Sequence, residues 1–160
     1  MERVSWEEAV EFCRKLSAKE GRTYRLPAEA EWEYACRAGS QTKWCFGDNQ
    51  SRLGEYAWYG GNSDHKTHPV GEKKPNAWGL CDMHGNVWEW CSDSWGEHPS
   101  TAVHDPTGAT AGSSRVDRGG SWCDGARNCR SAHRGLDAPE DRDGDLGFRV
   151  ASSSVDATGK

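Results

Sequence analysis

Apolar residues recur at helical spacing in two segments near the start of the chain. Ser5 precedes the first segment and makes a capping box with Glu8, while Gly21 at its end readily takes the left-handed stop conformation. The apolar positions form one face, with charged residues opposite, and they are Trp6, Ala9, Val10, Cys13 and Leu16. This pattern predicts an amphipathic helix that starts at Ser5 and covers a core.

A second helix is predicted for residues 28–37. Pro27 precedes it, and Glu29 and Glu31 favour the positive end of its dipole. Further along the chain no helical period of useful length is found, and short apolar pieces alternate with Gly, Asn, Asp and Pro. These pieces predict short strands at residues 43–46, 56–59, 87–91, 115–117 and 148–151.

The composition indicates a core built largely from tryptophan side chains. The chain has 160 residues, of which 34% are hydrophobic, and it contains 19 glycines and nine tryptophans. Each indole buries a large area, so tryptophans can close one core with few leucines or isoleucines. We therefore expect a compact, loop-rich α+β domain at residues 4–151, with two helices and short antiparallel strands. Segments 107–114 and 152–160 have little to bury, so we expect the first to be mobile and the second to be a disordered tail.

The charge pattern argues against two classes of partner. The formal net charge is −5 and the pI is about 5.7, with acids and bases mixed along the chain. Neither nucleic acid nor an anionic membrane surface is therefore expected as a partner. The first residues lack an apolar export segment, and no stretch approaches the roughly 18 apolar residues of a spanning helix. The seven cysteines, an odd count without a C-x-x-C pair, are expected to be mostly reduced in a soluble, cytoplasmic, bacterial-type domain.

Four sequence motifs follow one another along the chain. The longest is GLCDMHGNVWEWCSD at residues 79–93; the others are VSW at 4–6, RLPAEAEWEYA at 25–35, and RGGSW at 118–122 leading to LGFR at 146–149. Together they resemble the formylglycine-generating-enzyme, or sulfatase-modifying-factor, family over residues 4–150. The resemblance implies a compact fold related to C-type lectins. The family's strand before the first helix has no counterpart here, so we expect the chain to be part of a larger parent protein.

The same resemblance implies a calcium site in the longest motif. Its ligands would be the carboxylates of Asp82 and Glu89 with the carbonyls of Gly85 and Val87, an oxygen-rich set of the kind that hard cations accept. The alternative is that the two acids pair with arginines or cap turns. His84 lies inside this motif. We expect its side chain to lie either at the surface or directly behind the calcium ligands.

Catalysis depends on the spacing of two cysteines. The resemblance implies that active members of the family carry a C-x-x-x-x-C pair, which binds copper(I) through two thiolates. With this copper they use oxygen to oxidise a substrate cysteine. Here five residues, instead of four, separate Cys123 from Cys129, and the loop is shorter. The pair could still meet in a disulfide or a metal site if the loop folds back. Alternatively, Cys129 is a buried residue beside Arg130 and Ala132.

The segment at residues 123–145 is rich in Asp, Gly, Arg and Asn and has no lysine. Its short polar side chains resemble the diversified ligand-binding face of retroelement-varied proteins with this fold, although a solvated salt-bridge surface explains them equally well. The candidate ligand-binding residues are Trp122, Asp124, Arg127, Asn128, Arg130, His133, Arg134, Asp137, Asp141, Asp143 and Asp145.

Two functions follow from these observations. The first is a non-catalytic binding or regulatory module that presents residues 123–145 to a protein or a small-molecule ligand. The alternative is a copper-dependent oxidase that converts a sulfatase cysteine to formylglycine, with Cys123 and Cys129 as the copper ligands.

Overall fold

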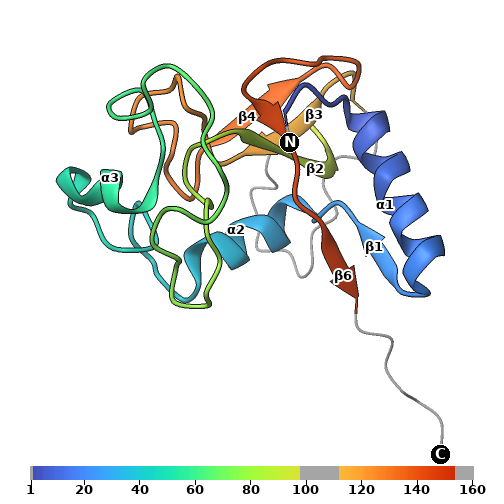
Figure 1. The fold of residues 1–160 in the computed structure, drawn as a ribbon, viewed down its shortest axis with the longest axis horizontal. Coiled ribbons are helices and arrows are strands. Elements are labelled where there is room, and N and C mark those ends of the chain that lie inside the picture. Colours follow the sequence, from blue (N-terminus) through green and yellow to red (C-terminus); the bar gives the residue numbers. More distant parts are fainter. Residues whose placement is uncertain (1, 98–111, 154–160) are drawn as a thin grey trace, which may run out of the picture.

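The structure is a computed structural model that describes residues 2–97 and 112–153. Helix α1 (Trp6–Glu20) lies at one end of the molecule, α2 (Glu29–Arg37) crosses the middle, and the short α3 (Leu53–Tyr56) lies at the opposite end (Figure 1). Most of the two segments expected to be mobile or disordered, namely 107–111 and 154–160, falls outside the described residues.

Helix α1 begins and ends as its sequence predicts. The Ser5 hydroxyl accepts a hydrogen bond from the Glu8 amide at 3.2 Å, and the Glu8 carboxylate accepts one from the Ser5 amide at 3.0 Å. Gly21 ends the helix with a φ of 65°, a left-handed conformation that costs glycine little. Ala9 and Cys13 are buried on the apolar face, so the predicted amphipathic helix is confirmed.

Helix α2 lacks half of its cap. Ala28 occupies the N-cap position without a side-chain acceptor, while the Glu31 carboxylate accepts a hydrogen bond from the Ala28 amide at 2.8 Å. Trp32 and Cys36 are buried where the helix packs against strands of the larger sheet. The predicted helix at residues 28–37 is thus confirmed to within one residue.

Two small sheets form the β part of the fold. In the four-stranded sheet the order is β4-β3-β2-β5, and the strands are β2 (Trp88–Ser94), β3 (Arg115–Arg118), β4 (Arg134–Asp137) and β5 (Leu146–Gly147). The two-stranded sheet pairs β1 (Thr23–Arg25) with β6 (Ala151–Ser153). All pairs are antiparallel except β2 with β5, which is parallel, so the expectation of antiparallel strands alone was wrong for this pair.

Several strand boundaries differ from the prediction. Residues 43–46 contribute only a bridge between Trp44 and Gly47, and residues 56–59 contribute only a bridge from Trp58 to Gly85. Turns surround both bridges, because neither segment has a long partner strand. Strand β6 extends two residues into the segment expected to be a tail, since its backbone pairs with β1. The strand predicted at residues 148–151 was wrong except at Ala151, because the chain pairs with β2 earlier, in β5, and with β1 later, in β6. Strands β1, β4 and β5, helix α3 and the 3₁₀ turn Gln50–Arg52 were not predicted.

Tryptophans carry much of the core, as the composition predicted. Trp32 and Trp90 are almost fully buried, in two separate clusters of apolar side chains. The Trp90 indole donates to the Val4 carbonyl at 2.9 Å, and the Trp6 indole donates to the Cys91 carbonyl at 2.8 Å. These bonds tie the segment around α1 to β2 and satisfy polar groups that burial would otherwise penalise.

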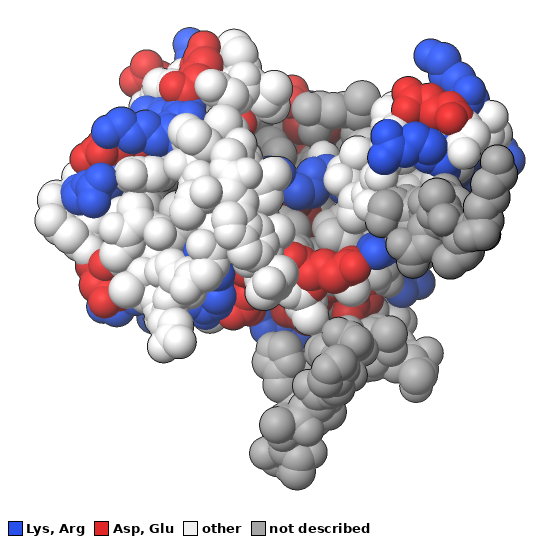
Figure 2. All heavy atoms as spheres, turned by 90° about the horizontal axis from the view of Figure 1, so that it is seen from below, with Lys and Arg blue, Asp and Glu red and all other residues white. Residues whose placement is uncertain are grey.

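Charged side chains of both signs share the surface, and the cysteines are unpaired. All seven cysteines lie within the described residues and are free thiols. On the face shown in Figure 2, basic and acidic side chains lie next to one another and do not form separate fields. Among the described residues, no helix has the length and apolar character that crossing a bilayer requires.

Candidate functional site

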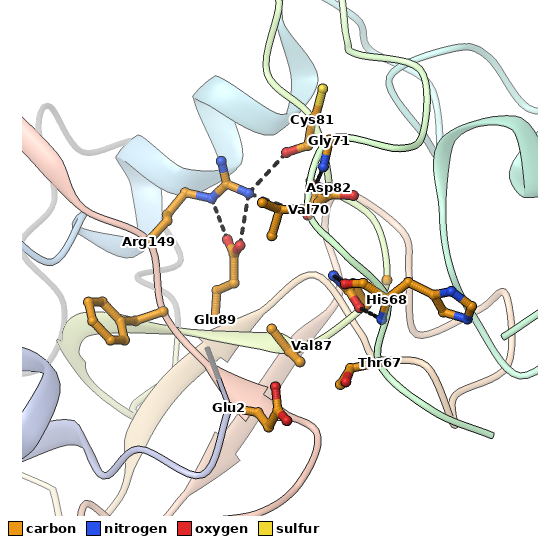
Figure 3. A pocket seen from close by; sticks show the side chains of 13 residues that line it. Glu2, Thr67, His68, Val70, Gly71, Cys81, Asp82, Val87, Glu89 and Arg149 are labelled. Atoms are coloured by element: carbon orange, nitrogen blue, oxygen red, sulfur yellow. Dashed lines mark hydrogen bonds and ion pairs between the residues drawn. The ribbon is translucent and has the colours of Figure 1, made fainter. Parts of the chain in front are cut away.

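A pocket of about 350 Å³ lies beside the start of β2. The four residues expected to hold calcium, which are Asp82, Gly85, Val87 and Glu89, all line it, so the structure brings them together (Figure 3). Thr67, His68, Val70 and Gly71 also line the pocket, as do Phe148 and Arg149, which lies next to Glu89.

Glu89 is held by three donors at the wall of this pocket. Its side chain is 6% exposed, and its two oxygens accept from the Arg149 guanidinium at 2.5 and 2.8 Å. The Trp32 indole donates to the same carboxylate at 2.7 Å. Burial acts to lower the pKa of Arg149, but the charge and hydrogen bonds of Glu89 and the charge of Asp82 together outweigh it, so this pKa is raised. Glu89 therefore does pair with an arginine, as the alternative to calcium proposed.

Asp82 and Gly85 shape the floor of the pocket. One Asp82 oxygen accepts from the Gly71 amide at 2.7 Å, whereas the other is buried without a hydrogen-bond partner among the described residues. Gly85 has a φ of 75°, and a side chain there would lie only 2.1 Å from the Trp58 carbonyl oxygen. This close approach explains why glycine is required at the position.

Asn86 joins the two walls of the pocket. Its side chain accepts from the His68 amide at 3.0 Å and donates to the His68 carbonyl at 3.1 Å, and the His68 ring stacks on Trp58 with centroids 3.7 Å apart. Sequence reasoning assigned no role to Asn86, and it expected Arg149 to pair with an acid of residues 123–145 or with a ligand's carboxylate, not with Glu89. The motif placed both residues in the family pattern, but only the fold brings residue 149 to residue 89.

The pocket fits calcium in part. The buried Asp82 oxygen that has no hydrogen-bond partner within the described residues is a donor that a hard cation accepts. Glu89, however, already has a guanidinium as its counter-charge. Calcium would therefore have to share that carboxylate with Arg149.

His84 is not at the surface, which corrects one alternative for this residue. It is 2% exposed, its Nδ1 lies 2.8 Å from the Cys129 carbonyl, and its Nε2 accepts from the Cys45 amide at 3.2 Å. Burial lowers the pKa of His84 to about 4. The imidazole is thus a neutral link between the signature loop and the loop that carries Cys129.

Cys123 and Cys129 occupy different environments. Cys129 is fully buried, and a side chain added at Gly120 would lie 2.9 Å from its sulfur. Burial, followed by the nearby charge of Asp124, raises the pKa of Cys129 far above the ordinary range. Cys123 is exposed, and its thiol contacts Asp145 instead. Burial also raises the pKa of the Cys123 thiol, although the Ser121 hydroxyl, 3.2 Å from its sulfur, acts in the opposite direction and favours the thiolate. The thiolate form that copper binding needs is therefore disfavoured at both sulfurs, and most strongly at Cys129.

Several side chains of the candidate ligand-binding face serve the fold. The Arg134 guanidinium donates to both oxygens of the buried Glu29, at 2.5 and 2.8 Å, and stacks on Trp95. The Trp122 indole donates to the Gly144 carbonyl at 3.2 Å. Arg130 donates to the Arg127 carbonyl at 2.8 Å. These side chains are therefore engaged within the molecule.

Other members of the face are arranged around a buried acid that sequence reasoning missed. Asp117 on β3 is 1% exposed, and burial, together with Asp137, raises its pKa well above the usual range. The Asp141 carboxylate accepts from the Ala138 amide at 3.0 Å and so closes a turn. Arg127 and Asp143 are exposed, and Asn128 and His133 are half-buried. The strand predicted at residues 115–117 gave no sign that Asp117 is buried, because alternation would place it opposite the buried Val116.

The family model described as the sulfatase-modifying factor enzyme 1-like domain matches residues 1–154. The chain belongs to this family. The sequence-based recognition and the α+β fold are thereby confirmed.

Among curated members of the sulfatase-modifying-factor family, the formylglycine-generating enzyme of Mus musculus is 37% identical over 168 residues, which cover 95% of this chain and 44% of the relative. The inactive C-alpha-formylglycine-generating enzyme 2 of the same organism is 35% identical, with 94% and 48% covered. The chain thus spans about half the length of the curated relatives it matches. Four relatives at 35–37% identity are named formylglycine-generating enzyme, which favours the oxidase alternative over the binding module.

A solved structure shares the fold over nearly the whole chain. Treponema denticola variable protein 1 has a TM-score of 0.90 and 36% sequence identity, and the match covers 94% of this chain and 69% of that one. Members of the sulfatase-modifying-factor family that are similar to this chain therefore carry names of an enzyme, of an inactive relative and of a variable protein. Function has to be argued from the residues.

Proposed function

We propose that this domain is a non-catalytic binding module with its ligand-binding face at residues 123–145. The observation that carries the proposal is the sulfur of Cys129, which is fully buried beneath Gly120 while Cys123 is exposed. Copper(I) held by two cysteines needs both as thiolate ligands at one accessible site. Burial keeps the Cys129 thiol protonated. The partner that we propose is a protein or a small molecule that contacts the exposed members of the face.

The test is a turnover assay with an active formylglycine-generating enzyme run in parallel. The purified protein is incubated with copper(I), oxygen and a peptide that carries the C-x-P-x-R sequence, and the aldehyde product is sought by mass spectrometry. We expect product from the active enzyme and none from this protein. Turnover by this protein that disappears in Cys129→Ser would overturn the proposal.

The second candidate function is the formylglycine-generating oxidase. The names of the four curated relatives at 35–37% identity favour it. In that case Cys123 and Cys129 would hold copper(I), which supplies oxygen activation, and the loop at residues 123–129 would have to bring the buried sulfur to the surface. Loss of turnover in both Cys123→Ser and Cys129→Ser, with retention in Cys81→Ser, is the result that this candidate requires.

We also propose calcium as an occupant of the pocket beside β2. The buried, unpartnered oxygen of Asp82 supports this proposal, and the competing guanidinium of Arg149 limits the affinity. A ligand that binds only the folded form raises its stability by RT ln(1 + [L]/Kd). Calcium added to chelator-treated protein should therefore raise the melting temperature, and Asp82→Asn should abolish the rise.

Asp64→Asn is the matched control for calcium, because Asp64 is an exposed loop carboxylate outside the pocket. Its melting temperature should still rise with calcium. An unchanged melting temperature of the wild type on calcium addition would remove this ion from the pocket.

A further inference from the structure

Three metal-binding atoms meet at the exposed edge of residues 121–145. The Cys123 sulfur lies 3.3 Å from an Asp145 oxygen, and one ligand atom each of Cys123, Asp124 and Asp145 lies within 4.8 Å of the other two. The hydroxyl of Ser121 lies between them, 2.6 Å from Asp124, 3.1 Å from Asp145 and 3.2 Å from the Cys123 sulfur. Thiol, carboxylate and hydroxyl groups therefore gather close enough for one ion to contact them.

The backbone holds these side chains in place without a ligand. The Asp124 amide donates to the Ser121 carbonyl at 3.2 Å, and the Gly60 amide donates to the Asp124 carbonyl at 2.8 Å. The Asn128 amide group donates to one Asp124 oxygen at 2.5 Å, which leaves the other oxygen toward Ser121. The Trp88 amide fixes the Asp145 carbonyl at 2.7 Å. A site whose ligands are oriented beforehand loses less entropy when an ion binds.

The carboxylates of this edge lack a counter-charge. Within residues 2–97 and 112–153, neither Asp124 nor Asp145 forms an ion pair with a lysine, arginine or histidine. Asp117, which is 1% exposed, has an oxygen with no hydrogen-bond partner in the same part of the chain. Asp145 is among the charges that raise the pKa of Asp117, after burial and Asp137. The negative field of this edge thus extends to a buried acid and would be relieved by a bound cation.

We propose that Cys123, Asp124 and Asp145 form a binding site for a divalent transition-metal ion of the zinc class. One thiolate and two carboxylates are ligands that zinc accepts, and three protein ligands leave a fourth position open. Because Cys123 is exposed, that position faces solvent and could be taken by water or by a donor atom of a bound partner.

This site lies within the proposed ligand-binding face, to which Asp124 and Asp145 belong, but it requires neither a bound partner nor the copper alternative. It uses Cys123 but not Cys129, whose sulfur is buried, and hard and borderline ligands replace the second thiolate. In the metal-free state the Cys123 thiol donates to Asp145 and the Ser121 hydroxyl donates to Asp124. An ion would release the thiol proton and take the place of these two hydrogen bonds.

Cobalt(II) is the probe for this site, because it takes zinc-like coordination and reports bonding to sulfur by absorbance. Metal-free protein is titrated with cobalt(II), and zinc is then added in competition. We expect one equivalent of cobalt, a thiolate-to-cobalt charge-transfer band, and loss of that band on zinc addition. A wild type that shows no band would overturn the proposal.

Variants separate this site from other thiols and from misfolding. Cys123→Ser should abolish the charge-transfer band, and Asp145→Asn should weaken binding most strongly among the carboxylate variants. Asn128→Ala should weaken it by about tenfold, because Asn128 only orients Asp124. Cys81→Ser should leave the band unchanged. Circular dichroism and melting curves of each metal-free variant check the fold.

Two outcomes of this series are decisive against the site. A band that persists in Cys123→Ser would place the metal elsewhere. If the single variants Cys123→Ser and Cys129→Ser each lose metal binding, the metal belongs to a two-thiolate site. The metal titration does not measure turnover. The proposed metal site can therefore be refuted while the proposed binding module stands, and the binding module can be refuted while the metal site stands.

Discussion

The pocket beside β2 and the edge around Cys123 both gather carboxylates, but they neutralise them differently. In the pocket, Glu89 is paired with Arg149 and bonded to Trp32. At the edge, Asp124 and Asp145 contact a hydroxyl and a thiol, with no cationic side chain in ion-pair range among the described residues. The difference separates acids that complete the fold from acids that are available to a ligand.

Acids that pair with cations and acids that do not are also separated by residue type in the described part of the molecule. Every ion pair between side chains there uses a glutamate, and none uses an aspartate. The buried arginines show the consequence: Arg118 pairs with Glu29 and Glu33, and Arg134 also pairs with Glu29. Glutamate charges thus stabilise contacts between α2 and the sheet. By contrast, Asp124, Asp141 and Asp145 accept hydrogen bonds from neutral groups, and burial favours the protonated form of Asp117.

The largest expected effect is at the compensated pocket. Glu89→Ala leaves the Arg149 guanidinium partly buried without its partner, and it removes the acceptor of the Trp32 indole. Breaking one side of a buried pair typically costs roughly 3–5 kcal/mol. Urea unfolding at pH 7 should show a loss of that size. The double variant Glu89→Leu with Arg149→Met should recover part of it, and a single-variant loss below about 1 kcal/mol would contradict a structural role for the pair.

A smaller effect is expected from the neutral imidazole behind the pocket. The pKa of His84 is lowered to about 4 by burial, so the unfolded chain binds a proton more readily than the folded one between pH 6.5 and 4. Stability should therefore fall as pH decreases through that range, by about 2 kcal/mol between pH 7 and pH 5. Urea unfolding of the wild type and of His84→Gln at both pH values measures the difference. An equal pH dependence in the two proteins would refute this assignment.

Asp117 should show the opposite pH dependence behind the uncompensated edge. Its pKa is raised, so the folded chain holds a proton that the unfolded chain releases, and stability falls as pH rises above the ordinary aspartate range. Asp117→Asn mimics the protonated acid and should be more stable than the wild type at pH 8, by about 1 kcal/mol or more. The advantage should shrink toward pH 4. Unfolding is measured with a chelator present, and a destabilised Asp117→Asn at pH 8 would argue against a protonated Asp117.

The sequence predicted what depends on neighbours along the chain. The Ser5 and Glu8 cap and the Ala28 start of the second helix could be found because both partners of each contact lie within one turn. The signature motif also contains part of the lining of the pocket beside β2. Its four predicted calcium ligands meet there, since they belong to one short loop and the strand that follows it.

Contacts between distant segments were not predictable in the same way. Arg149 reaches Glu89 across 60 positions, and Asp145 reaches Cys123 across 22. Strand β4 exists because its backbone pairs with β3, although its own residues have little strand character. Counting residues between Cys123 and Cys129 likewise gave no indication that one sulfur would be exposed and the other buried.

The smallest expected effect tests whether burial, and not pairing alone, separates the two kinds of acid. Glu11 on α1 is paired with Arg14 at 2.7 Å, and that hydrogen bond lowers the pKa of Glu11 to about 2, yet both side chains are largely exposed. Water and salt screen such a pair, so it adds little to stability despite the shifted pKa. The melting temperature of Glu11→Gln at pH 7 should match that of the wild type, whereas Glu89→Gln should lower it. If both variants lower the melting temperature equally, then pairing with an arginine, and not burial of the acid, determines its contribution to stability.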